Sequence, residues 1–214
     1  MATNSQLESP LLGLPQEILD RVYGYYLALD PSDFIDSLRP FHDFIEKEEP
    51  ESGPLPPLML TCKRAYYDLR EHVHHEAAIR IYTTELGVRV GLAARGTLRY
   101  DRLHKLYLVP AMEHPHWNRW LPLLEEVAKR ATGLRDLVVD WQPRQQIHTS
   151  KWDRTLHAKK EQQFFQIVGK FPQLRTIRLY GNIPAHWKQS LGEATPARVV
   201  QHECKWWKDP GGNW

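Results

Sequence analysis

Apolar residues recur at helical spacing in two short stretches near the start of the chain. In residues 11–29 the apolar stripe consists of Ile18, Leu19, Val22, Tyr26 and Leu29. In residues 58–69 it consists of Leu58, Cys62, Tyr66 and Leu69. Pro15 suits a first helical position, because its fixed φ fits a helix and it has no N–H to leave unpaired. Neither helix is long enough to form a core alone, so we expect each to cover the other's stripe.

Beyond these stretches the pattern becomes that of strands and an approximate repeat. Residues 78–82 alternate and predict a first strand, whereas residues 86–94 suggest a short helix ended near Gly96. Three later segments share the spacing Leu-x-x-Leu-x-Leu, and helical patterns precede the second and third. The spacing is occupied by Leu103, Leu106 and Leu108, by Leu134, Leu137 and Val139, and by Leu174, Ile177 and Leu179.

These segments predict parallel strands whose inward side chains stack under covering helices. The order of helix, break and strand resembles a leucine-rich repeat, and Asn182 occupies the asparagine position of that repeat in the third copy. The periods are irregular and the copies few, so a small α/β layer is the safer description. The expected fold class is α/β and helix-rich: an N-terminal helical unit followed by a short βα-repeat layer with a small parallel sheet.

The two N-terminal stretches together resemble an F-box. The resemblance rests on Leu14-Pro15-x-Glu17-Ile18-Leu19-x-x-Val22-Tyr23-x-Tyr25, followed by Leu58-x-Leu60-x-Cys62-Lys63-Arg64-x-Tyr66-x-x-Leu69. It is closest to the F-box-like domains common in fungal proteins. In that family a short acidic turn joins the two halves, whereas here residues 30–57 intervene. The resemblance implies a helical unit that docks on a Skp-type adaptor of a cullin-based ubiquitin ligase, while the rest of the chain holds the substrate.

The resemblance and the patterns together suggest three parts. Residues 11–78 form the F-box-like unit with an acidic, Pro-rich insertion at 30–57, residues 79–200 form the repeat-like partner-binding region, and residues 201–214 form a Trp-rich tail. The adaptor-binding residues that the resemblance implies are Leu14, Pro15, Ile18, Leu19, Val22, Leu58, Leu60 and Cys62. Some of these must pack the unit's own interior, and the sequence does not divide them.

Composition narrows the function classes. The 214 residues carry a net charge of +2, but residues 30–51 hold eight acidic residues against two basic ones, so the remainder is basic. Its basic clusters are scattered and match no nucleic-acid-binding motif, so we expect solvated faces and no nucleic acid. No apolar run approaches membrane-spanning length and no signal peptide is present, so no membrane partner is expected. Two cysteines and no leader predict a reducing compartment, cytosol or nucleus.

The most tempting cluster for chemistry is His72-x-His74-His75-Glu76. On a helix His72 shares a face with His75 or Glu76, but a closed zinc site needs about four ligands. His114 and His116 lie in a different segment, and no His-Glu-x-x-His, paired-cysteine or phosphate-loop motif occurs. We therefore expect exposed helix histidines, no metal, no cofactor and no catalytic residue.

A binding surface is easier to place. Strand alternation turns one row of side chains away from the helices, and adjacent strands of a repeat-type sheet present such a row in register. Tryptophans are numerous and are enriched at binding hot spots. We expect Trp120 in the core and Trp206, Trp207 and Trp214 at an interface. The candidate partner-binding residues are Lys105, Tyr107, Asp136, Val138, Arg178, Tyr180, Trp206 and Trp207.

The sequence thus favours a non-catalytic adaptor over an enzyme. On this hypothesis the chain is an F-box-like substrate receptor, monomeric outside its complex, that binds a Skp-type adaptor and an unidentified protein substrate. The alternative is an interaction or regulatory module outside the ubiquitin pathway, whose helices cap the repeat layer. A metal-dependent hydrolase using His72 to Glu76 is the third possibility.

Overall fold

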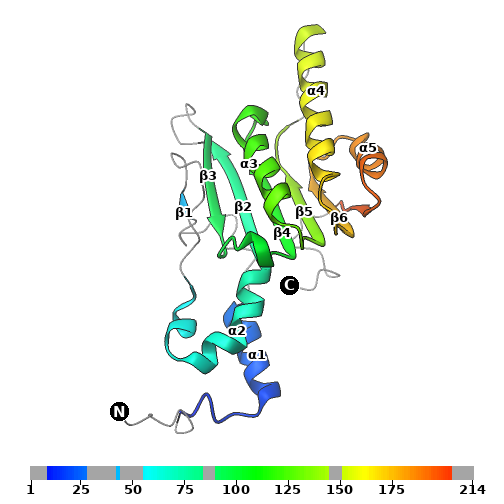
Figure 1. Ribbon diagram of the computed structural model, residues 1–214. Coiled ribbons are helices and arrows are strands. Elements are labelled where there is room, and N and C mark those ends of the chain that lie inside the picture. Colours follow the sequence, from blue (N-terminus) through cyan, green and yellow to red (C-terminus); the bar gives the residue numbers. More distant parts are fainter. Residues whose placement is uncertain (1–8, 28–41, 44–54, 84–89, 145–150, 204–214) are drawn as a thin grey trace.

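The computed structural model of the protein describes residues 9–27, 42–43, 55–83, 90–144 and 151–203. These residues form a helical unit and an α/β unit (Figure 1). Each unit has its own buried cluster. The helical unit contains α1 (Gln16–Leu27), the 3₁₀ turn η3 (Pro57–Leu60) and α2 (Lys63–His75). Most of the predicted insertion at residues 30–57, and Trp206, Trp207 and Trp214 of the tail, lie outside the described residues.

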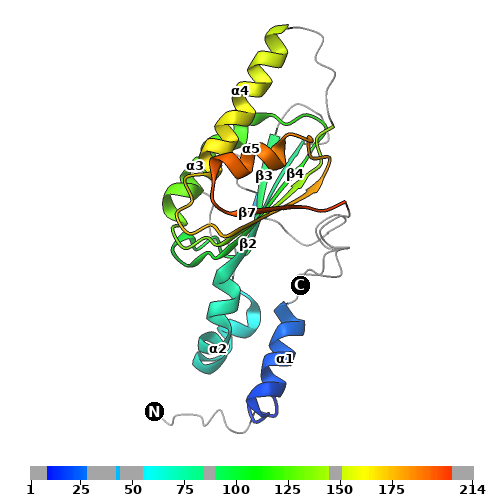
Figure 2. The same cartoon turned by 90° about the vertical axis from the view of Figure 1, so that its right-hand side faces the viewer.

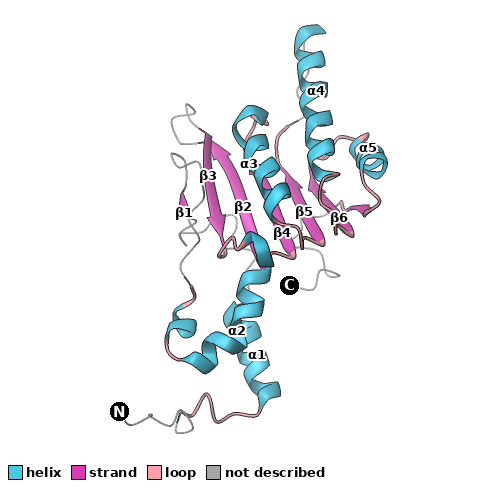
Figure 3. Ribbon diagram, viewed as in Figure 1, coloured by secondary structure: helices cyan, strands magenta, loops and turns pink. Residues whose placement is uncertain are grey.

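The α/β unit contains one seven-stranded, mostly parallel sheet in the order β1-β3-β2-β4-β5-β6-β7. Only the β1–β3 and β2–β3 pairs are antiparallel. Figure 3 distinguishes the strands from the helices by colour. The strands are β1 (His42–Asp43), β2 (Glu76–Thr83), β3 (Val90–Arg95), β4 (Lys105–Ala111), β5 (Asp136–Trp141), β6 (Thr176–Gly181) and β7 (Arg198–Gln201).

From β4 onward each strand pairs with the next strand along the chain, and one helix lies in each connection. These helices are α3 (Trp117–Arg130), α4 (Lys151–Val168) and α5 (Trp187–Ala194); the short turn η4 (Tyr100–Arg102) precedes β4. Figures 1 and 2 together show α3, α4 and α5 on one face of the sheet. This order provides the parallel α/β layer that the repeated spacing predicts.

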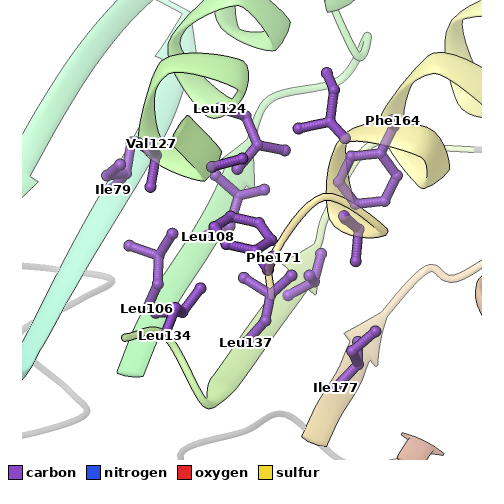
Figure 4. Packing of buried hydrophobic residues seen from close by; sticks show 14 of the residues in the cluster. Ile79, Leu106, Leu108, Leu124, Val127, Leu134, Leu137, Phe164, Phe171 and Ile177 are labelled. Carbon is purple, nitrogen blue, oxygen red and sulfur yellow. The ribbon is translucent and has the colours of Figure 1, made fainter. Parts of the chain in front are cut away.

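The main core lies between that face of the sheet and the helices. All nine positions of the three Leu-x-x-Leu-x-Leu segments are buried there. The two positions of each segment that lie on a strand are two residues apart, so alternation places both on this face. Figure 4 shows Leu106, Leu137 and Ile177 of neighbouring strands below Leu124 of α3 and Phe164 of α4. Trp120 is buried in the same cluster, which confirms its expected place.

One expected element is wrong. The sequence predicts a short helix at residues 86–94, but residues 90–95 form β3, which pairs antiparallel with β2. Val90 and Leu92 pack against the main core as alternate residues of a strand, and Ala94 is buried in that core. The short apolar run fits either structure, and pairing with β2 decides for the strand because it satisfies the backbone groups of both segments.

Candidate protein-interaction surfaces

The helical unit has a small hydrophobic core of its own. Its buried cluster consists of Leu19 and Tyr23 from α1, Met59 from η3 and Leu69 from α2. The Sγ of Cys62 caps α2 by accepting a hydrogen bond from the backbone N–H of Ala65, at 3.4 Å. Such a cap satisfies one of the free N–H groups at the helix start, so the cysteine has a structural role.

Hydrogen bonds join segments of the helical unit that lie far apart in the sequence. The Nη1 of Arg64 donates to the backbone oxygen of Leu12 at 2.8 Å, and the N–H of Leu58 donates to the hydroxyl of Tyr26 at 3.2 Å. The hydroxyl of Tyr23 donates to Asp68 at 3.4 Å. Burial, reinforced by the charge of Asp68, raises the pKa of Tyr23, so this hydroxyl keeps its proton.

The structure divides the eight predicted adaptor-binding residues into three groups. Leu19 is buried in the interior of the helical unit, so it cannot contact a partner in this conformation. Leu14, Val22, Leu58 and Cys62 are half-buried, and Leu14 and Leu58 pack against the buried cluster. Pro15, Ile18 and Leu60 are exposed. Leu19 is therefore one of the residues that pack the interior of the unit, a division that helix periodicity could not make because it identifies an apolar position but not its neighbour.

Large apolar side chains remain exposed on the same unit. The structure describes six exposed large hydrophobic residues, and all but Leu156 lie on α1, η3 or α2. The five on the helical unit, which we call the exposed strip, are Ile18 (42% exposed), Tyr25 (85%), Tyr26 (43%), Leu60 (69%) and Tyr67 (58%). The three tyrosines were not among the predicted site residues, although Tyr25 belongs to the motif and Tyr26 to the apolar stripe.

The predicted row on the sheet is in register but largely covered. Lys105 pairs with Asp136, and Tyr107 pairs with Val138, which in turn pairs with Arg178. These side chains lie on the sheet face opposite the main core, as alternation predicts. The row as a whole contains Lys105, Asp136 and Arg178, which are half-buried, and Tyr107, Val138 and Tyr180, which are buried.

Burial therefore changes the interpretation of this row. Tyr180 stacks on His202 with 4.6 Å between ring centroids, and Lys105 lies over the ring of Tyr107 at 4.9 Å. Burial raises the pKa of Tyr107 far above its ordinary value, so its hydroxyl stays protonated. The expectation of an open recognition surface is wrong for Tyr107, Val138 and Tyr180, because an outward direction on a strand does not guarantee contact with solvent.

The histidines near the end of α2 also differ from expectation. His72 is exposed, but His74 is buried and its Nδ1 lies 2.7 Å from the hydroxyl of Thr97. Burial lowers the pKa of His74, and the charges of Arg102 and Arg99 lower it further, so the ring is neutral at pH 7. His75 packs on His104 with ring centroids 4.1 Å apart. These side chains join α2 to the sheet, and in the described residues no three His, Cys, Asp or Glu side chains are placed to hold a metal ion.

A second cluster of titratable groups surrounds the buried carboxylate of Glu161. Trp187 Nε1 donates to it at 3.0 Å, His186 Nε2 lies 2.8 Å from its Oε2, and His157 Nε2 lies 3.3 Å from its Oε1. Trp117 Nε1 donates to His157 Nδ1 at 3.3 Å, so His157 carries its proton on Nε2 and points it at Glu161. The network therefore links α4 to the start of α5 and to Trp117 of α3.

Comparison of the chain with models of protein families, with curated proteins and with solved structures found no match. The class of protein therefore follows from the structure alone: a mixed α/β protein whose mostly parallel sheet is preceded by a small helical unit. Among the described helices, none has both the length and the apolar composition needed to cross a membrane.

Proposed function

We propose that this chain is a non-catalytic, F-box-like adaptor. Its helical unit docks on a Skp-type adaptor of a cullin-based ubiquitin ligase, and its α/β unit holds a protein target. The chemistry then belongs to the assembled ligase, and this chain only places one protein beside another. The proposal joins the motif resemblance of α1, η3 and α2 to the surface that these elements present.

The observation that carries the proposal is the concentration of exposed apolar side chains on the helical unit. Tyr25, Leu60 and Tyr67 are more than half exposed, although the unit has a closed interior of its own. Exposed apolar side chains that gather on one small unit mark an interaction site, and burying each large one stabilises a complex by about 1.5–3 kcal/mol. Ile18 and Leu60 belong both to the motif and to the exposed strip, so we place the contact there.

The direct test is binding of the purified protein to a purified Skp-type adaptor. We expect Ile18→Asp and Leu60→Asp each to weaken binding by at least about tenfold, because a charge would be buried in an apolar contact. Leu156→Asp on α4 is the matched control, since Leu156 is 39% exposed and lies outside the helical unit. Failure of the intact protein to bind, or equal weakening by the control, would contradict the proposal.

A second candidate is an interaction or regulatory module outside the ubiquitin pathway, in which the helical unit caps the sheet. The observation in its favour is the direct passage from α2 to β2: His75 ends the helix, Glu76 begins the strand, and the backbone oxygen of His75 accepts from the N–H of His104 at 2.9 Å. This alternative predicts that the intact protein does not bind the Skp-type adaptor, which the same experiment decides.

A further inference from the structure

The sheet has a second face, opposite the main core, and the centre of this face is buried. Its central side chains are Tyr107, Val109 and Val138, each 3% exposed, and Tyr180, 1% exposed; we call these four residues the sheet patch. Tyr107 and Val138 are cross-strand neighbours, and alternation along β4 and β5 places both opposite the main core. The sheet patch is therefore as well shielded from water as the core on the other side of the sheet.

The described helices do not cover the sheet patch. α3, α4 and α5 lie on the face that carries the main core, and α1 and α2 belong to the helical unit (Figures 1 and 2). Parallel sheets are normally covered on both faces, because their strands bury apolar side chains on both sides. The second face of this sheet therefore requires a covering segment besides the five described helices.

The chain itself moves onto this face at the end of its described part. β7 ends at Gln201, and the N–H of His202 then donates to the backbone oxygen of Leu179 at 2.9 Å. The ring of His202 stacks on Tyr180, with ring centroids 4.6 Å apart and 8° between the ring planes. The described chain therefore ends beside the sheet patch, and residues 204–214 continue from there.

The length and composition of residues 204–214 suit the sheet patch. These eleven residues contain three of the chain's eight tryptophans, Trp206, Trp207 and Trp214. A tryptophan buries a large apolar area and packs well against other rings, such as those of Tyr107 and Tyr180. Five residues in extended conformation span up to about 17 Å, whereas β4 lies two strand spacings of about 4.8 Å from β6. The segment is thus long enough for Trp206 and Trp207 to reach Tyr107.

The acidic insertion at residues 30–57 is the rival occupant of this face. Arg80 on β2 would suit an acidic segment, because its buried Nε has no hydrogen-bond partner among the described residues. Arg80 is the register neighbour of Val109, however, and so lies at the margin of the sheet patch. The patch itself consists of valine and tyrosine side chains, and burial raises the pKa of Tyr107, so its hydroxyl stays neutral. A carboxylate would lose its water there without gaining a partner, so a Trp-rich segment fits the patch better.

We propose that residues 204–214 pack across the sheet patch, with Trp206 and Trp207 over Val138 and Tyr107. The segment then covers the surface on which the sequence placed partner recognition. A protein target reaches this face only by displacing the segment, so the segment controls access to the sheet. This inference concerns the α/β unit and holds whether or not the helical unit docks on a Skp-type adaptor.

The test is hydroxyl-radical footprinting of the full-length protein, read at individual tyrosines by mass spectrometry. In the double variant Trp206→Ser and Trp207→Ser, oxidation of Tyr107 should rise at least about fivefold, because its ring loses the atoms that exclude water from it. Tyr100, which is 6% exposed and belongs to the main core, should stay protected and so report that the fold is intact.

The matched control is Tyr25→Ser with Tyr67→Ser, which removes two exposed rings from the helical unit and should leave Tyr107 protected. An unchanged Tyr107 in the tryptophan variant overturns the proposal, and so does an equal rise in the control. A rise that occurs only after deletion of residues 44–54 also overturns it, because the acidic insertion is then the cover.

Photo-cross-linking decides the case in which Tyr100 also becomes reactive, since the tryptophan variant has then lost its fold. The substitution Trp207→p-benzoylphenylalanine is made in the full-length protein, and irradiation should link this residue to residues 105–111 or 136–141 of the same molecule. Links to α3, α4 or α5, links between two molecules, or the absence of any link overturn the proposal.

Discussion

Glu161 keeps its negative charge inside the protein because three side chains point hydrogens at it. Burial alone would raise the pKa of this carboxyl, but the hydrogen bonds from His157, Trp187 and His186 outweigh burial and lower the pKa below its ordinary value. The network links α4, which carries Glu161 and His157, to the start of α5. Its members lie far from any recognisable motif, so the sequence indicated none of it.

At this scale we predict that Glu161→Gln lowers the free energy of unfolding at pH 7 by about 1–3 kcal/mol, because an amide nitrogen would face donors that the carboxylate now accepts. The folded-state pKa lies below the unfolded value of about 4.3, so the stabilisation is complete above that value and is lost as pH falls through the folded pKa. Urea unfolding of both proteins between neutral and acid pH measures the difference.

The control is Glu126→Gln, since Glu126 is exposed and pairs with the exposed Lys129 at 3.7 Å. Exposed pairs contribute little, so this variant should change stability by less than about 1 kcal/mol at every pH. A penalty for Glu161→Gln that does not shrink on acidification would show that the carboxylate's charge is not what the network stabilises.

At the scale of elements, the periodic patterns predicted α3, α4 and the strands β2, β4, β5 and β6, but neither α5 nor β7. Leucine, isoleucine and valine at alternate positions lie on the same face of a strand, whichever strand it pairs with. The inward residues could therefore be predicted from the sequence. For residues of β3 the sequence predicted a helix, because the identity of β3 as a strand depends on pairing with β2. A short apolar run carries no information about a partner that lies elsewhere in the chain.

Gly181, at the end of β6, illustrates a constraint on an element. Its φ of +84° lies in the left-handed region, and a Cβ there would meet the backbone oxygen of Trp141. We predict that Gly181→Ala lowers the free energy of unfolding by at least about 1–2 kcal/mol, because an L side chain is strained in that conformation. Thermal and urea unfolding measure the change.

Gly192 in α5 provides the comparison, since a Cβ built there would meet no atom within 4 Å apart from its chain neighbours and the helix's own backbone. An alanine at a helical position loses less backbone entropy on folding than a glycine, so Gly192→Ala should stabilise the protein by about 0.5–1 kcal/mol. Equal effects of the two alanines would refute the argument from backbone conformation.

At the scale of the whole molecule, two buried clusters of unequal size divide the chain. The helical unit is built on Leu19, Tyr23, Met59 and Leu69, whereas the α/β unit buries the strand and helix residues of Figure 4 and many more. Small cores leave little free energy above the entropy of ordering the chain. The helical unit should therefore open more readily than the sheet.

We predict from this that Leu19→Ala, which costs about 2–5 kcal/mol at a fully buried site, accelerates hydrogen exchange of α1 and α2 while leaving β4, β5 and β6 protected. Leu137→Ala, also at a fully buried site, should instead accelerate exchange throughout the sheet. Exchange followed by mass spectrometry distinguishes the units. Uniform acceleration by both variants would mean that the two cores unfold as one.

The sequence by itself determined which residues are apolar and with what period they recur, and therefore the two N-terminal helices and the inward rows of β4, β5 and β6. Only the tertiary structure decided which of these surfaces stay open. It buried Leu19, His74 and Tyr180 and left Leu60 and Arg175 exposed. The reason is physical: periodicity is a property of one segment, whereas exposure depends on what the rest of the chain places against it.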